Sequence, residues 1–143
     1  MTQTTKLDQQ VHAIYNYCRE RAVVPNPPYW LIGDDESLSY CWSCLQAHLP
    51  PDAEVGLDWG GGYCYEGDGP EVCEDCGELL DYELTSSGAT EELAHFAQYP
   101  PDLTNPEVCY AFAAIADAVY SDQEKRLLVS IFKMAQRAQR QTN

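Results

Sequence analysis

Two cysteine pairs carry the clearest chemical signal in the sequence. Cys41 and Cys44 form one Cys-x-x-Cys motif, and Cys73 and Cys76 form a second one 28 residues further on. The short spacing within each pair lets one tight turn direct two sulfurs toward one ion, and two such turns supply the four thiolates of a tetrahedral zinc site. Gly77 directly follows the second pair and can adopt a positive φ that brings backbone amides close to the sulfurs.

These residues resemble a zinc ribbon, in which two cysteine pairs on hairpin-like turns hold one zinc ion. The resemblance covers roughly residues 38–84 and implies a structural Zn²⁺ bound by the four cysteines. The gap between the pairs is longer than the usual spacing of about 15 to 20 residues. Many zinc ribbons bind nucleic acid through basic residues beside the cysteines. In this chain acidic residues lie beside the cysteines instead, so nucleic-acid binding is not expected from the resemblance.

Other uses of the cysteines are less well supported. A redox dithiol needs a helix N-terminus or a cation to lower a thiol pKa, and no Lys or Arg lies near the first pair. A catalytic zinc keeps an open coordination position, which four thiolates would close. Cys64 and His48 lie close to the pairs and stay open as alternative ligands. Cys18 and Cys109 fall on apolar helical faces and are expected to be small buried residues.

Charge is the second signal. The chain has 23 Asp and Glu against 8 Lys and Arg, which gives a net charge of −15. Residues 22–124 contain 21 of the acidic residues and not one Lys or Arg. A soluble surface usually mixes both signs, because charges of one sign repel each other and destabilise the compact state. The exclusion of cations from this long segment therefore favours a functional reason.

Such a density of carboxylates predicts a basic partner. Duplex DNA is a dense array of negative charge, so an acidic protein can take its place in the cationic groove of a nucleic-acid-binding protein. The acidic protein itself would repel DNA. We expect the acidic residues around the cysteines to bind such a protein or nucleoprotein complex: Asp34, Asp35, Glu36, Glu66, Asp68, Glu71, Glu74, Asp75, Glu78, Asp81 and Glu83. Nearby aromatic residues are candidate anchors, with a place in the core as the open alternative for Trp42 and Tyr82: Trp42, Trp59, Tyr63, Tyr65 and Tyr82.

The predicted function is that of a small zinc-stabilised inhibitor. In composition the chain is similar to the acidic DNA-mimic, anti-CRISPR and anti-restriction proteins of phages and mobile elements. It has no phosphate-binding glycine loop and no recognisable nucleophile motif, so we do not expect an enzyme. The first alternative is a cellular zinc-ribbon adaptor that assembles a complex through its C-terminal helices. The second is an enzyme or a metal-dependent sensor.

The compartment is expected to be the cytoplasm. The segment MTQTTKLDQQ has no apolar core of a signal peptide, and the longest apolar run, at residues 111–116, is far too short for a membrane span. Seven cysteines are an odd number, which argues against a framework made only of disulfides. We therefore expect reduced thiols.

Periodicity and capping signals predict an α+β fold in one domain, 1–143. A zinc-ribbon-like β region, 25–88, is flanked by an N-terminal helix, 1–24, and by a helical region, 89–143. Helices are expected to begin after Thr5, Thr90, Asn105 and Ser121. The last two are expected to form a hairpin, in a monomer or a homodimer. Strands are expected at 29–32, 38–40, 62–65 and 79–84, with a glycine turn at 60–62.

Overall fold

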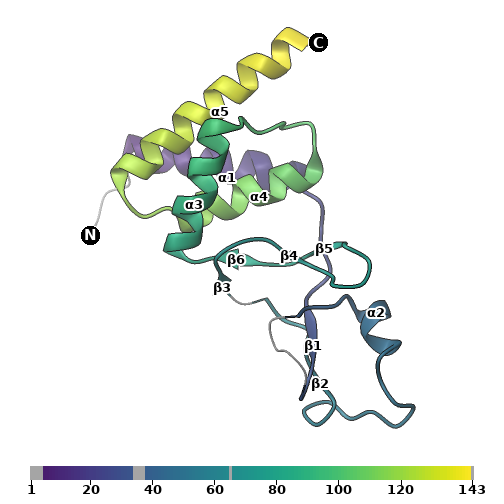
Figure 1. Cartoon of the computed structure of the whole chain (residues 1–143). Coiled ribbons are helices and arrows are strands. Elements are labelled where there is room, and N and C mark those ends of the chain that lie inside the picture. Colours follow the sequence, from purple (N-terminus) through teal and green to yellow (C-terminus); the bar gives the residue numbers. More distant parts are fainter. Residues whose placement is uncertain (1–4, 34–37, 65, 143) are drawn as a thin grey trace. The chain divides into compact units, whose positions relative to one another are not determined.

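The chain forms two compact units in the computed structural model, which describes residues 5–33, 38–64 and 66–142 (Figure 1). The first unit, called here the helical unit, comprises residues 1–23 and 84–143. The second, called here the acidic unit, comprises residues 24–83. Helices combined with short strands confirm the α+β class. The single domain over 1–143 stays a prediction.

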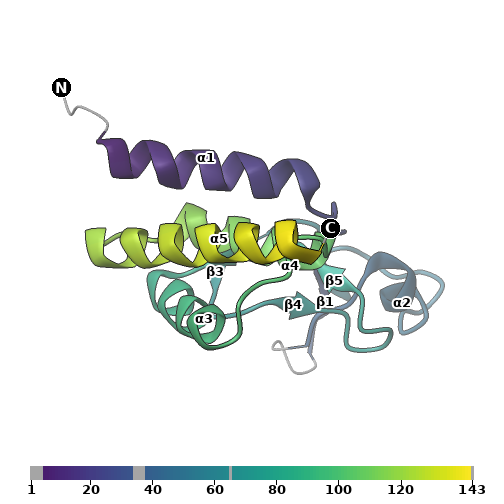
Figure 2. The ribbon, with the colours of Figure 1, turned by 90° about the horizontal axis from the view of Figure 1, so that it is seen from above.

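The described residues of the helical unit form four helices. They are α1 (Lys6–Arg21), α3 (Ser86–Gln98), α4 (Pro106–Ala118) and α5 (Asp122–Thr142). Helix α1 packs against α4 and α5, and α3 also packs against α4 and α5; Figure 2 shows α1 and α5 side by side. Among the described residues, no helix is both long enough and apolar enough to span a bilayer.

The ends of these helices follow from local capping. Side-chain oxygens of Thr5, Asn105 and Ser121 each accept a hydrogen bond from a backbone N–H in the first turn, so three predicted helix starts are confirmed. The predicted start of α3 at Thr90 is wrong. Thr85 caps this helix instead, because its hydroxyl accepts from the backbone N–H of Gly88 at 3.0 Å.

The arrangement of the helices also differs from the prediction, in which α4 and α5 pack on each other as a hairpin and α1 lies apart from them. The rings of Phe112 in α4 and Phe132 in α5 stack with centroids 6.2 Å apart. However, the extensive packing of both helices is with α1 and α3. Helix α4 explains why, because its buried residues occupy most of its circumference and one neighbour cannot cover them all: Cys109, Tyr110, Phe112, Ala113, Ile115 and Ala116.

The acidic unit contains short strands and one short helix. Strand β1 (Tyr29–Leu31) pairs antiparallel with β2 (Trp59–Gly61), and β4 (Glu71–Val72) pairs antiparallel with β5 (Leu79–Leu80). The other elements are α2 (Trp42–Gln46), β3 (Glu66–Gly67) and β6 (Glu83–Leu84), which ends across the unit boundary. In the predicted strand 38–40 only Tyr40 makes a bridge, to Tyr29.

Two strand predictions need correction. The strand predicted at 62–65 lies at 59–61, so the expected glycine turn contributes to a strand. At Gly61, φ is +116° and a Cβ atom would lie 2.5 Å from the carbonyl oxygen of Pro28, so only glycine permits this approach to β1. The strand predicted at 79–84 is divided into β5 and β6. Its predicted alternation is confirmed, since Leu80, Tyr82 and Leu84 are all buried.

The aromatic core of the helical unit gives a stability prediction. Phe112 has no exposed surface and lies between Phe96, 5.7 Å away, and Phe132. Phe112→Ala should lower the free energy of unfolding of this unit by about 3–5 kcal/mol, because it leaves a cavity that the neighbours fill only partly. Urea unfolding followed by helical circular dichroism measures the change.

A matched aromatic truncation serves as the control. Tyr120 is 85% exposed, and Tyr120→Ala should change the free energy of unfolding by less than about 0.5 kcal/mol. Equal effects of the two substitutions would contradict the packing described for α3, α4 and α5.

Candidate metal centre and acidic surface

The second cysteine pair lies in the turn between β4 and β5. The backbone N–H of Cys73 donates to the carbonyl oxygen of Glu78 at 2.8 Å, and the N–H of Gly77 donates to the carbonyl oxygen of Cys73 at 2.9 Å. Gly77 has a φ of +75°, which an L side chain rarely adopts. The hairpin turn expected for Cys73 and Cys76 is therefore present, and the glycine has the conformation that the sequence predicted.

The first cysteine pair lies at the start of a helix. Cys41 is the N-cap of the five-residue helix α2, and Cys44 lies within it. The N–H of Leu45 donates to the carbonyl oxygen of Cys41 at 2.9 Å, which closes the first turn and places both sulfurs on one side of it. Since a zinc ribbon carries both pairs on hairpin-like turns, the zinc-ribbon fold is not confirmed.

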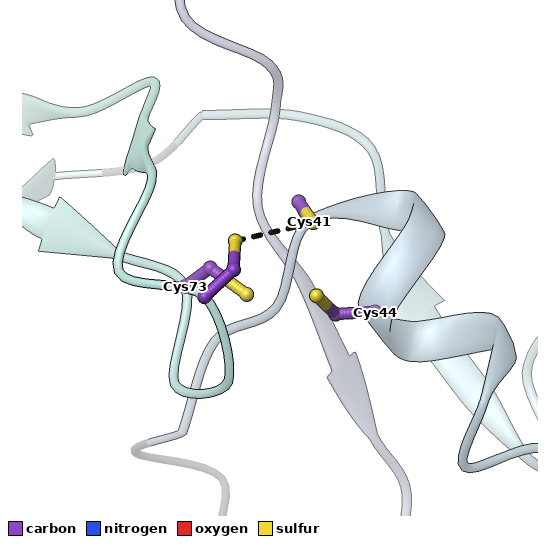
Figure 3. A group of neighbouring side chains, drawn as sticks. Cys41, Cys44 and Cys73 are labelled. Carbon is purple, nitrogen blue, oxygen red and sulfur yellow. Dashed lines mark hydrogen bonds between the residues drawn. The ribbon is translucent and has the colours of Figure 1, made fainter.

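The four sulfurs of Cys41, Cys44, Cys73 and Cys76 form one cluster, and all lie within 4.8 Å of one another. Figure 3 shows the labelled side chains of Cys41, Cys44 and Cys73 directed into a common space. The sulfurs of Cys41 and Cys76 are 3.9 Å apart. A tetrahedral ion with metal–sulfur bonds of about 2.3 Å would space its sulfurs about 3.8 Å apart. The cluster could therefore hold a metal ion with little movement.

The alternative ligands lie outside this cluster. Cys64 is not among the grouped sulfurs, and His48 is not part of the group either. The imidazole Nε2 of His48 instead makes a 2.6 Å contact with the carboxylate Oδ2 of Asp75. This contact links the segment after α2 to the turn between β4 and β5. His48 therefore connects the two cysteine-bearing loops from outside the ligand set.

The protonation of the sulfurs fits a site that is completed by a cation. Burial raises the pKa of the Cys73 thiol, but backbone hydrogen bonds, the largest from Cys76 and Cys41, lower it more, to about 7. Hydrogen bonds to the sulfurs of Cys41 and Cys73 raise the pKa of Cys44. Four thiolates this close together would repel each other, and a divalent cation bound between them would offset that repulsion.

The cluster is also the centre of the acidic unit's core. One cluster of buried residues in this core consists of Tyr40, Cys41, Leu45, Cys73 and Leu80. Two of these five are candidate ligands, so the sulfurs and the apolar core occupy the same small volume. In contrast, the buried Cys18 and Cys109 lie in the helical unit, and Cys109 donates to the carbonyl oxygen of Leu103 at 3.3 Å. Both are small buried residues, as predicted, and none of the seven cysteines forms a disulfide.

Side chains near the cluster join its two halves. The hydroxyl of Ser39 donates to the carboxylate of Glu71 at 3.0 Å, and the N–H of Glu74 donates to the carbonyl oxygen of Ser39 at 2.8 Å. The amide of Asn26 donates to the carboxylate of Glu78 at 3.1 Å. Glu71, Glu78 and Asp75 were predicted to bind a partner. Each also makes a contact within the acidic unit, so their substitution would disturb structure as well as charge.

The two units differ sharply in charge. Residues 24–83 hold 14 of the 23 carboxylates and none of the 8 Lys and Arg, so the acidic unit carries −14. The helical unit holds the other 9 carboxylates and all 8 Lys and Arg, so it carries −1. Nearly the whole net charge of the chain therefore belongs to the smaller, cysteine-centred unit. Four thiolates around a divalent ion would add a further two negative charges.

None of the described carboxylates in the acidic unit is buried. Among those predicted to bind a partner, six are exposed: Glu66, Asp68, Glu74, Asp75, Glu78 and Glu83. Glu71 and Asp81 are partly exposed. Asp34, Asp35 and Glu36 lie outside the described residues, as does Tyr65. Solvent, and hence a partner, can reach all the described acidic side chains in this unit.

Sequence reasoning missed one part of this surface, the segment 50–58. It carries the exposed Asp52 and Glu54 and the partly exposed Asp58. Val55 and Leu57 are 67% and 69% exposed, although both are apolar. The absence of Lys and Arg over residues 22–124 already included this segment. However, the predicted partner-binding residues were limited to the acidic residues near the cysteine pairs and to residues 34–36. Of the predicted aromatic anchors, Tyr82 is a core residue instead.

The comparisons with known proteins add no family. No protein-family model, no curated protein and no solved structure matches the chain. The metal centre and the charge distribution are therefore interpreted from their own geometry and chemistry.

The geometry predicts one bound metal ion per chain. Cys73→Ser should abolish stoichiometric binding, because the hydroxyl is a poor ligand for a soft divalent ion and three thiolates leave the site open. Titration of the reduced, metal-free protein with Co²⁺, followed by visible absorption, measures the stoichiometry, because thiolate-bound Co²⁺ absorbs strongly.

Three matched variants define the ligand set. Cys64→Ser, Cys109→Ser and His48→Gln should each still bind one ion, because none of these side chains belongs to the sulfur cluster. Loss of the ion in Cys64→Ser, with binding retained in Cys73→Ser, would show that a different group of cysteines holds the metal.

Proposed function

We propose that the cluster binds Zn²⁺ as a structural ion. Four thiolates in a tetrahedral arrangement are a donor set that zinc prefers, and they leave no position for a substrate. The observation that carries this proposal is the approach of all four sulfurs to within 4.8 Å, with one sulfur pair at 3.9 Å. A redox dithiol is less well supported, because it needs one pair of sulfurs and here two pairs converge.

The acidic unit is proposed to bind a basic surface on a nucleic-acid-binding protein or nucleoprotein complex. The observation that carries this second part is the segregation of charge, with −14 on the acidic unit and −1 on the helical unit. Solubility alone would be served by acids spread over both units. A concentrated field instead speeds association with a cationic surface and competes with the phosphates that such a surface binds.

The role that follows is inhibition by competition. A protein that occupies a cationic groove excludes nucleic acid from it, as a DNA mimic, an anti-CRISPR protein or another anti-defence inhibitor would. The proposal is for a binding protein and not for an enzyme. It requires no direct contact with nucleic acid, which the acidic unit would repel.

An adaptor that assembles a complex through its helices is the alternative function. One observation favours it: a cavity of about 320 Å³ between α1 and α5, lined by apolar residues that include Ile14, Tyr17, Val129 and Phe132. Nothing about this cavity explains the charge of the other unit, so the inhibitor function is preferred. The two functions place the binding surface on different units, which makes them separable by mutation.

A salt-dependent capture experiment tests the proposal. The zinc-loaded chain is immobilised and exposed to nuclease-treated bacterial lysate over a series of salt concentrations. A basic nucleic-acid-binding protein should be retained at low salt, released as the salt screens the charges, and displaced by added DNA or RNA. Capture that resists salt and is not displaced by nucleic acid would contradict the proposal.

Charge-matched variants locate the surface. The triple variant Glu66→Gln, Glu74→Gln and Glu83→Gln removes three exposed charges from the acidic unit and should weaken capture by about threefold to a hundredfold, since each lost charge pair costs a few tenths to one kcal/mol. The control, Glu91→Gln, Glu107→Gln and Asp117→Asn, removes three exposed charges from the helical unit. It should have a much smaller effect. The reverse ranking would favour the adaptor.

A further inference from the structure

A cavity lies beside the cysteine cluster within the acidic unit. It measures about 340 Å³ and is lined by Trp42, Gln46, Leu49, Pro50, Pro51, Ala53 and Trp59. Most of these residues are apolar, and no titratable side chain lines the cavity. Its size suits one or two side chains of a partner and is small for a large cofactor.

Two indole rings form its most distinctive walls. The ring centroids of Trp42 and Trp59 are 4.9 Å apart with an interplanar angle of 62°. Tyr29 packs behind both rings, 5.0 Å from Trp42 and 5.9 Å from Trp59. Trp42 is 38% exposed and Trp59 is partly exposed, so aromatic surface is open to a ligand. Tyr29 therefore contacts both tryptophans and does not line the cavity.

Three carboxylates belong to residues next to the cavity lining in the sequence. Asp52 and Glu54 flank the lining residue Ala53, and Asp58 directly precedes Trp59. The Asp58 carboxylate accepts a hydrogen bond from the N–H of Glu54 at 2.8 Å, which holds this loop in a closed turn. The acidic unit has no Lys or Arg that could neutralise these groups. An aromatic cavity in such a field favours a cationic guest over an uncharged one.

We propose that this cavity binds an arginine side chain of the basic partner, by stacking of the guanidinium on the ring of Trp42 with its edge against the inclined ring of Trp59. The planar guanidinium is weakly hydrated and stacks on aromatic faces, whereas the lysine ammonium is more strongly hydrated. The inference rests on the proposed function, because it names the anchor through which the acidic unit holds a cationic surface. Long-range charge would steer the partner, and the cavity would select arginine.

The cavity is also coupled to the metal centre. Trp42 stands between the candidate ligands Cys41 and Cys44 and begins α2, so a metal bound there would fix the position of one cavity wall. Loss of the metal should therefore weaken arginine binding even though every carboxylate is still present. A binding mode that used charge alone would be much less sensitive to the metal.

The test uses the zinc-loaded full chain and three short glycine-rich peptides. One carries arginine, the second lysine and the third citrulline, which keeps the shape of arginine without its charge. Indole N–H signals in ¹⁵N-correlated NMR spectra report on the three tryptophans separately. With the arginine peptide, the signals of Trp42 and Trp59 should shift more than that of Trp30. The lysine peptide should bind several-fold more weakly, and the citrulline peptide should produce little change.

Substitutions separate the cavity from the general charge. Trp42→Ala should weaken binding of the arginine peptide about five- to tenfold, while Trp42→Phe should restore most of it, provided that both variants still bind one Co²⁺. Tyr120→Ala is the control, because Tyr120 is 85% exposed and belongs to the helical unit. Its effect should be less than twofold.

Other outcomes would overturn the inference. Peptide binding that leaves the Trp42 and Trp59 signals unchanged, or that Trp42→Ala does not weaken, would show that carboxylates alone bind cations. The cavity proposal would then be wrong, and the proposed function would stand if basic protein is still captured from lysate. If capture fails as well, both are wrong. Equal binding of the arginine and citrulline peptides would show that the cavity does not select charge.

Discussion

The convergence of four sulfurs is the interaction on which the acidic unit depends. Its described strands are two or three residues long, and two of the five residues in its buried core cluster are candidate metal ligands. Its 14 carboxylates repel one another without a single Lys or Arg to offset them. A structural zinc site contributes roughly 10–16 kcal/mol of binding free energy, which is comparable to the whole stability of a typical domain. A metal ion that links the two cysteine pairs would let such a unit concentrate negative charge and still fold.

The helical unit follows a different physical strategy. Its stability comes from aromatic and aliphatic packing among four capped helices, and its cations almost balance its carboxylates. Lys125 of α5 donates to the carboxylate of Asp8 in α1 at 2.8 Å, so opposite charges also join its helices. The chain thus combines a conventional apolar core with a unit in whose core four cysteine sulfurs converge.

Local chemistry explains which features the sequence could predict. The caps Thr5, Asn105 and Ser121 act within one helical turn, and each cysteine pair shares a single turn, so spacing alone was informative. The packing of α1 with α4 joins segments far apart in the chain, and periodicity cannot specify such a pairing. Neither could it show that Cys41 begins a helix, because residues 42–46 form only about one turn. The cavity beside Trp42 was missed for the same reason, since Trp59 reaches it through tertiary contacts.

Backbone hydrogen exchange, measured on the same chain with zinc and after its removal by a chelator under reducing conditions, tests the central claim most directly. Our account predicts that protection in the segments 38–49 and 66–82 is lost with the metal, whereas helices α1, α4 and α5 keep theirs. Unchanged protection in the cysteine-bearing segments would show that the acidic unit folds without a metal, and the structural role given to the four sulfurs would be wrong.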